Sequence, residues 1–279
     1  TINANYILPL TNLIQGDHEL HIRAKDNFGK WSLYSQNTVT VGNWNCIYED
    51  TPIGHYAYNA ITNLCDLEIL DNDGLAEPNK TINRAELAKI TYLSVGLQDH
   101  AVADVFPSPF NDLQDKEDAW YYTYAKNLSY LEFDDNTAPF DRNYFNFKPS
   151  KEITLANTLK VLLEAWNIDE TNHSGTTPFI DEGLNEHYGY DYIVKAYDLG
   201  LISDTFNHLI NPDGFIKRGD AFVILHKILE TLTPPTILES DFFIPGNYTP
   251  ANFASFAGMH SGNFNHYTKT SFAIGSVGI

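Results

Sequence analysis

The sequence predicts a mainly α-helical protein of three helix–loop–helix repeats in a pseudo-threefold arrangement, with short β segments at both ends. Three observations lead to this fold class. Similar residues recur three times in the same order, apolar residues follow helical spacing within each copy, and apolar and polar residues alternate near the start of the chain. They divide the chain into five parts. The end of a β-sandwich is predicted over 1–42, and a linker with the start of another β module over 233–279. Repeats 1, 2 and 3 lie between them, over 43–99, 100–174 and 175–232.

The first 42 residues are predicted to form β-strands. Leu20, Ile22 and Ala24 share one face of a strand, charged or polar residues share the other, and a turn signal follows at 27–29. A second strand is predicted over 38–41. The pattern resembles the closing strands of an immunoglobulin-like or fibronectin-III-like sandwich. Because a full sandwich needs about 100 residues, we expect the chain to be an excerpt of a longer one.

Each repeat opens with an apolar or aromatic residue two places before an aspartate. These openings are Tyr48-x-Asp50, Val102-x-Asp104 and Phe179-x-Asp181. An aromatic pair follows: His55-Tyr56, Trp120-Tyr121 and His187-Tyr188. A first helix with an apolar stripe comes next in each copy, and repeat 2 carries two insertions, near 107–118 and 134–147.

A second helix begins after a loop that holds a proline. Six residues after each proline lies the same slot, occupied by Arg84, Leu155 and Arg218. Two residues later stands a polar acceptor: Glu86, Asn157 or Asp220. Before the slot, Asn83 or Thr154 is a good N-cap, and Asn83 with Glu86 matches a capping box. We therefore assign the three acceptors to helix starts and not to catalysis. A single unit cannot bury its own apolar stripe, so we expect the three to pack together.

These residues carry a resemblance to a known family. Asn83-Arg84-Ala85-Glu86 resembles the Thr-Arg-Ala-Glu motif of the S-layer homology (SLH) domain, and the openings match that family over roughly 44 to 232. The resemblance implies that the arginine lies in a groove between repeats and helps to hold a secondary cell-wall polysaccharide, often through a pyruvate-ketal carboxylate. This expectation transfers to Arg84 and Arg218 only. Leu155 cannot hold an anion, so the groove of repeat 2 is expected to be degenerate.

The arginines have two readings. A helix N-terminus attracts anions, and the planar fork of arginine suits a carboxylate or phosphate. Alternatively, each arginine pairs with an acid of a neighbouring repeat, for instance Asp50, Asp104 or Asp181. Both readings stay open. Trp120 is a candidate for stacking on a sugar ring, whereas the equivalent Tyr56 and Tyr188 are expected to pack in the core.

Composition excludes several classes of function. The net charge of −19 leaves no basic stripe for nucleic acid, and an anionic membrane surface would repel the chain. No apolar run approaches the roughly 20 residues of a membrane span, so we expect no membrane insertion. No motif of a known catalytic constellation is present, which predicts a non-enzyme.

Metal and redox chemistry are weakly indicated. The run 71–74 hints at a calcium loop, but it fails the EF-hand pattern, so no metal or cofactor is expected and a looser Ca²⁺ site is the alternative. Cys46 and Cys65 are the only cysteines of the sequence. They either form one disulfide, as an extracellular setting allows, or are two small buried apolar side chains.

The sequence thus predicts a non-catalytic module at the extracellular cell surface. Its expected partner is a cell-envelope polysaccharide or peptidoglycan, together with other surface proteins, and its role is to attach a larger secreted protein. The alternative is a degenerate SLH scaffold that acts as a protein-interaction or spacer module, which Leu155 and the uneven repeat lengths favour.

Overall fold

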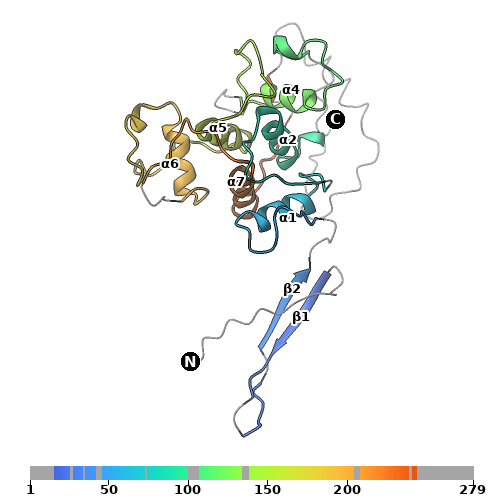
Figure 1. Cartoon of the computed structure of the whole chain (residues 1–279). Helices are drawn as coiled ribbons and strands as arrows, with labels where there is room; N and C mark the ends of the chain where they lie inside the picture. Colours follow the sequence, from blue (N-terminus) through green and yellow to red (C-terminus); the bar gives the residue numbers. More distant parts are fainter. Residues whose placement is uncertain are drawn as a thin grey trace, which may run out of the picture. The chain divides into compact units, whose positions relative to one another are not determined.

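A computed structural model of the chain describes most of its residues (Figure 1). The described ranges are 16–25, 28–33, 35–41, 46–72, 74–99, 107–133, 138–203, 208–238 and 241–243. Within them the protein is mainly helical, with six α-helices and one two-stranded sheet. The chain divides into two compact units, residues 1–75 and 76–279.

The first unit holds a hairpin and one helix. Strands β1 (Gly16–Ile22) and β2 (Ser35–Val41) pair antiparallel, which confirms the strands predicted near the start of the chain. Helix α1 (Tyr58–Asp66) follows, with Ala60, Ile61 and Leu64 buried as their spacing predicts. A disulfide joins Cys46 to Cys65 in the last turn of α1, so the first of the two readings of the cysteines is confirmed.

The second unit holds the other five helices. They are α2 (Arg84–Ser94), α4 (Tyr122–Tyr130), α5 (Leu155–Ala165), α6 (Tyr190–Asp198) and α7 (Arg218–Thr231). Short 3-10 turns lie at η1 (Leu97–Asp99), η2 (Asn111–Leu113) and η3 (Leu184–Glu186). Helix α2 packs against α4, α5 and α7, while α6 packs against α5 (Figure 1). Their inward residues, among them Leu87, Leu128, Leu159, Phe222 and Leu225, are fully buried.

Three extended segments lead into α2, α5 and α7 and pair with one another. The Ile82 amide donates to the Ile216 carbonyl at 3.1 Å, Ile216 donates to Ile153 at 3.2 Å, and Ile153 donates back to Ile82 at 3.3 Å. All three isoleucine side chains are buried. The backbone bonds therefore form a closed cycle through parts of the chain that lie far apart in sequence.

The helix starts continue this cyclic order. The first amides of α2, α5 and α7 belong to Arg84, Leu155 and Arg218, and they donate to the carbonyls of Lys151, Gly214 and Lys80. The next amides belong to Ala85, Ala156 and Gly219, and they donate to the carbonyls of Pro149, Pro212 and Pro78. The first two amides of each helix are thus satisfied by the proline loop of another copy. These amides do not serve as an anion site, so the arginine side chains alone remain for that role.

The chain after α7 packs against the end of α4. Leu131 forms a bridge with Phe242, and the Phe243 amide donates to the Tyr130 carbonyl at 2.7 Å. The ring of Phe243 stacks on Tyr130 and lies 3.7 Å from the guanidinium of Arg142. Residues 241–243, the start of the β module predicted after the linker, are therefore docked. The rest of that predicted module, 244–279, lies outside the described residues.

Candidate functional site

Arg84 is the first residue of α2, and its side chain packs against the end of the repeat 2 insertion. Its Nε donates to the Phe147 carbonyl at 2.5 Å, and its guanidinium lies 5.0 and 5.1 Å from the ring centres of Phe140 and Phe147. Burial lowers the pKa of Arg84, and the charges of Asp112 and Tyr144 oppose that shift. Among the described residues, no carboxylate forms an ion pair with Arg84. Its terminal nitrogens remain available to an anion from outside the chain.

Arg218 occupies the same position in α7 but has a different partner. Its Nε donates to the Ala76 carbonyl at 2.9 Å, two residues before Pro78, and the Arg84 Nε likewise donates to the Phe147 carbonyl, two residues before Pro149. Its Nη1 also lies 2.6 Å from Glu86 Oε1. Both side chains are largely buried, so the pair is partly shielded from solvent. The reading in which an arginine pairs with an acid of a neighbouring copy therefore holds for Arg218.

Glu86 serves two roles at the start of α2. Its Oε2 accepts from the Asn83 amide while the Asn83 side chain accepts from the Glu86 amide, so the predicted capping box is confirmed. Its Oε1 neutralises Arg218. Arg218 bonds to the loop before α2, the helix of Glu86, and Arg84 bonds in the same way to the loop before α5, the helix of Asn157. Asn157 is therefore the residue equivalent to Glu86 at the Arg84 site. Because Asn157 has no charge, Arg84 lacks the counterion that Arg218 has.

The other two helix starts differ from α2. In α5 the Thr154 side chain accepts from the Asn157 amide at 3.3 Å, as expected for an N-cap, and Leu155 fills the arginine slot. In α7 the N-cap is Lys217, whose side chain accepts no capping bond, and Asp220 lies in the first turn. The acceptors thus all lie at helix starts, but only α2 has the full box.

Three aromatic side chains stand two residues before α1, α4 and α6. Tyr56, Trp120 and Tyr188 are 55, 54 and 55% exposed. The prediction that the two tyrosines pack in the core is wrong. The residue after Tyr188, Gly189, lies close to α5, since a Cβ there would come within 2.6 Å of the Ala156 Cβ. The backbone after Tyr188 makes the close contact, and the tyrosine ring is left outside.

The histidines before these aromatics help to start the helices. His55 Nδ1 accepts from the Ala57 amide at 3.2 Å, and His187 Nδ1 accepts from the Gly189 amide at 3.0 Å. Trp120 lies against Tyr121 and Tyr124, with ring centres 5.4 and 6.4 Å away. It leads into α4, which packs on α2, the helix that begins with Arg84.

The leading aspartates hold the proline loops. Asp181 accepts from the amides of Ile210 and Asn211, both at 2.8 Å. In repeat 2, Asp112 makes the equivalent bonds, both at 2.7 Å, to the two amides before the loop proline. Asp104 lies outside the described residues, and the role of Asp50 stays a prediction. The sequence analysis missed Asp112, although Phe110-x-Asp112 fits the opening pattern as well as Val102-x-Asp104 does.

The comparisons with known proteins place the chain among surface proteins. No family model matches it. It is 28% identical over 186 residues to the Surface-layer 125 kDa protein of Lysinibacillus sphaericus, covering 64% of this chain and 14% of the relative. It is 27% identical over 173 residues to Cell surface glycoprotein 1 of Acetivibrio thermocellus, covering 57% and 7%. A cell wall amidase of Bacillus anthracis, described as uncharacterized, is 28% identical over 151 residues, covering 53% and 26%.

The chain is an extracellular cell-surface protein. It spans about a quarter or less of the length of each of these relatives. Among the described residues, no helix is long and apolar enough to cross a membrane.

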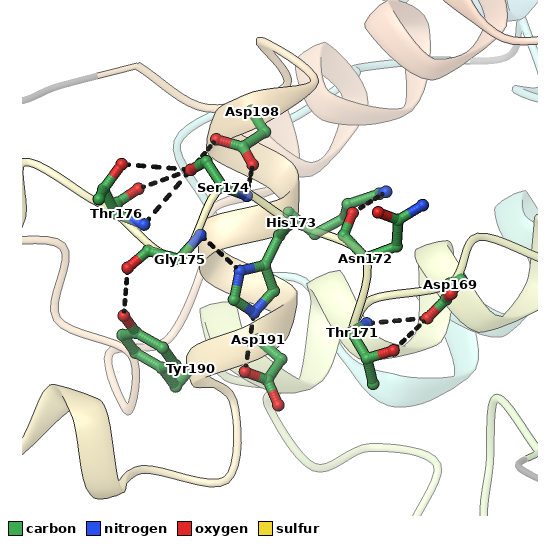
Figure 2. A network of polar contacts seen from close by, with 11 residues as sticks. Asp169, Thr171, Asn172, His173, Ser174, Gly175, Thr176, Tyr190, Asp191 and Asp198 are labelled. Carbon is green, nitrogen blue, oxygen red and sulfur yellow. Dashed lines mark hydrogen bonds and ion pairs between the residues drawn. The ribbon is translucent and has the colours of Figure 1, made fainter.

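A polar network fixes the loop after α5 of this cell-surface protein to α6 (Figure 2). Ser174 donates to Asp198 through both its amide, at 2.6 Å, and its hydroxyl, at 2.8 Å. His173 Nε2 lies 3.0 Å from Asp191, and its Nδ1 accepts from the Gly175 amide at 2.9 Å. Both ring nitrogens of His173 are therefore occupied, and neither activates the Ser174 hydroxyl as a nucleophile.

Metal ligands are not gathered in the part of the chain that the structure describes. No group of three or more His, Cys, Asp or Glu residues there could hold a metal ion. Asp73, in the run that hints at a calcium loop, lies outside the described residues.

Proposed function

We propose that the chain is a non-catalytic anchoring module that attaches a larger secreted protein to the cell envelope by binding an anionic polysaccharide. In this proposal residues 43–232 are three SLH-type repeats in a pseudo-threefold arrangement. The closed cycle of backbone bonds at Ile82, Ile153 and Ile216 supports that arrangement, and the cell-surface relatives support the role.

The observation that carries the proposal is the unpaired cation at Arg84. Removing a charged side chain from water is unfavourable unless it gains a partner, and among the described residues Arg84 gains one carbonyl and two aromatic faces and no ion pair. A carboxylate on the glycan would complete its hydrogen bonds through the two terminal nitrogens. Trp120, exposed and on the segment that leads into the neighbouring helix α4, would stack on the sugar that carries the carboxylate.

The test is binding of the whole chain to isolated envelope polysaccharide and to peptidoglycan. Substituting Arg84→Ala should weaken binding to one of these polymers by about tenfold to a hundredfold, as expected for a charge-assisted pair. Arg84→Lys is the matched control, because it keeps the charge and loses the planar fork, and it should bind with intermediate affinity. Equal affinity of wild type and Arg84→Ala, with the fold intact by circular dichroism, would refute the proposal.

A second candidate function is a protein-interaction or spacer module. The observation that favours it is Leu155, which occupies the arginine slot in one of the three copies. The same experiment separates the two, since a scaffold that lost its glycan sites would bind neither polymer.

A further inference from the structure

A second exposed surface surrounds Leu155, on the side of the molecule where the arginine slot has lost its charge. The Leu155 amide donates to the Gly214 carbonyl at 2.9 Å, and the next residue, Phe215, pairs with Thr154 through a β-bridge. Phe215 is 53% exposed although it is aromatic. Tyr188, 55% exposed, adjoins the same helix start through the close contact between Gly189 and α5.

Polar groups lie at the edge of these aromatic rings. His187 Nε2 lies 3.3 Å from Asp213 Oδ1, and the His187 and Tyr188 ring centres are 4.5 Å apart. The Asp213 side chain is 74% exposed. Burial raises the pKa of Tyr188, the hydroxyl of Thr154 lowers it, and the charges of Asp213 and Tyr144 raise it further. The Asp213 carboxylate is therefore close to the Tyr188 ring, through their shared neighbour His187.

We propose that this surface binds an uncharged pyranose ring. We call it the Leu155 surface, made of Leu155, Tyr188, Asp213 and Phe215. Exposed aromatic faces suit the C–H face of a sugar, while a carboxylate and a phenol at their edge suit its hydroxyl groups. An arginine in this slot would favour an anionic sugar, but the slot holds Leu155. The Asp213 carboxylate would in addition repel an anionic sugar. The ligand class is thus a neutral sugar.

The Leu155 surface adjoins the arginine site through the backbone. The amides of Arg84 and Ala85 donate to the carbonyls of Lys151 and Pro149, in the segment that leads into Leu155. One glycan chain could therefore place a carboxylate at Arg84 and an uncharged residue at the Leu155 surface. The inference rests on the proposed function for its polymer, but the two sites use different side chains and fail separately.

The experiment uses the whole chain and one envelope polysaccharide in two forms, native and with its carboxylates reduced to alcohols. Calorimetry is run for wild type, Tyr188→Ala and Arg84→Ala. We expect the reduced polymer to bind wild type weakly and Tyr188→Ala about tenfold more weakly, with Arg84→Ala unchanged. Tyr188→Phe is the matched control, since it keeps the ring and should retain binding of the reduced polymer within about threefold.

The outcomes separate the two proposals. Wild type that binds only the native polymer, in an Arg84-dependent way, overturns the Leu155 surface and leaves the anchoring proposal standing. If the reduced polymer binds in a Tyr188-dependent way and Arg84→Ala affects neither form, the Leu155 surface is supported and the anchoring proposal at Arg84 is overturned. Captured peptide or protein in place of sugar, with no binding of the reduced polymer, also overturns the inference.

A gain of charge provides an independent check. Leu155→Arg restores a cation in the third slot. The carbonyl that would accept from its Nε is that of Ile210, two residues before Pro212. Ala76 and Phe147, which accept from Arg218 and Arg84, lie at the same offset from Pro78 and Pro149. The variant should shift the preference of an Arg84→Ala background from the reduced to the native polymer. No shift, in a folded variant, would show that the Leu155 surface does not contact the glycan.

Discussion

Arg84 and Arg218 begin equivalent helices and donate to equivalent carbonyls, yet only Arg218 has a carboxylate partner among the described residues. Arg218 is neutralised by Glu86 at 2.6 Å, whereas Arg84 has two aromatic rings and no carboxylate partner among the described residues. The difference depends on one position in the next copy of the cycle, which is Glu86 in one case and Asn157 in the other. The same slot can therefore hold an arginine with an internal counterion or one without, according to a residue far away in sequence.

The largest effect is expected when the two environments are made alike. Asn157→Glu should place a carboxylate near Arg84 and weaken binding of the anionic polysaccharide by about tenfold to a hundredfold, because the ligand must then compete with an internal partner. Asn157→Gln, of the same size but uncharged, is the control and should bind as wild type. Calorimetry on both variants checks this, and unchanged affinity in Asn157→Glu would argue against Arg84 as the anion site.

The reverse change should act mainly on stability. Arg218→Ala leaves Glu86 without its partner in a partly buried place, so the free energy of unfolding should fall by about 1–2 kcal/mol. Adding Glu86→Gln to this variant removes the orphaned charge and should recover part of the loss. Urea unfolding measures both, and glycan affinity should change less than threefold. A large affinity loss in Arg218→Ala with normal stability would mean that Arg218 also binds ligand.

A pH series should separate the arginine site from the polar network after α5. Hydrogen bonds from the Ser174 amide and hydroxyl hold the pKa of Asp198 below its ordinary 3.8. Because the pKa is lower in the folded state, the ionised carboxylate stabilises this loop above about pH 4, and that contribution is lost as the pH falls below 3.8 and through the lower pKa of the folded state. Protection of the Ser174 amide from hydrogen exchange should fall as the pH drops below 3.8. Asp198→Asn should abolish this pH dependence of the protection.

The same series should leave the arginine site unchanged between pH 5 and 8. Although burial lowers the pKa of Arg84, a guanidinium stays charged in this range. Polysaccharide affinity that falls several-fold between pH 5 and 8 would point to a different charged group.

Salt should have the smallest effect. The net charge of −19 repels an anionic polymer at long range, whereas the Arg84 contact is short and partly shielded. Raising the salt from about 0.1 to 1 M should thus keep affinity within about threefold or increase it slightly. Binding that collapses at moderate salt would indicate diffuse surface attraction and not a formed site.

Local features of the fold could be predicted from the sequence, and distant pairings could not. The capping box of Asn83 and Glu86 and the N-cap at Thr154 depend on neighbours three residues away, so the residue pattern contains them. The pairing of Arg218 with Glu86 depends on the cyclic order of the helix starts. The sequence offered 36 acids as partners and no way to choose among them.

Insertions and close contacts caused the other misses. In repeat 2 two segments fit the opening pattern, and only the bonds to the proline loop single out Asp112. Tyr188 is exposed while the next residue, Gly189, lies close to α5, and periodicity does not encode this contact between distant segments.

The closed cycle of Ile82, Ile153 and Ile216 has a consequence for how the chain folds. In an open stack of repeats, a terminal copy can be lost and the rest keeps its neighbours. In a cycle, every copy is both donor and acceptor, so deleting any one leaves a buried amide and a buried carbonyl without partners. The three segments that lead into α2, α5 and α7 are therefore expected to unfold together, because none of them can leave without breaking the bonds of the other two.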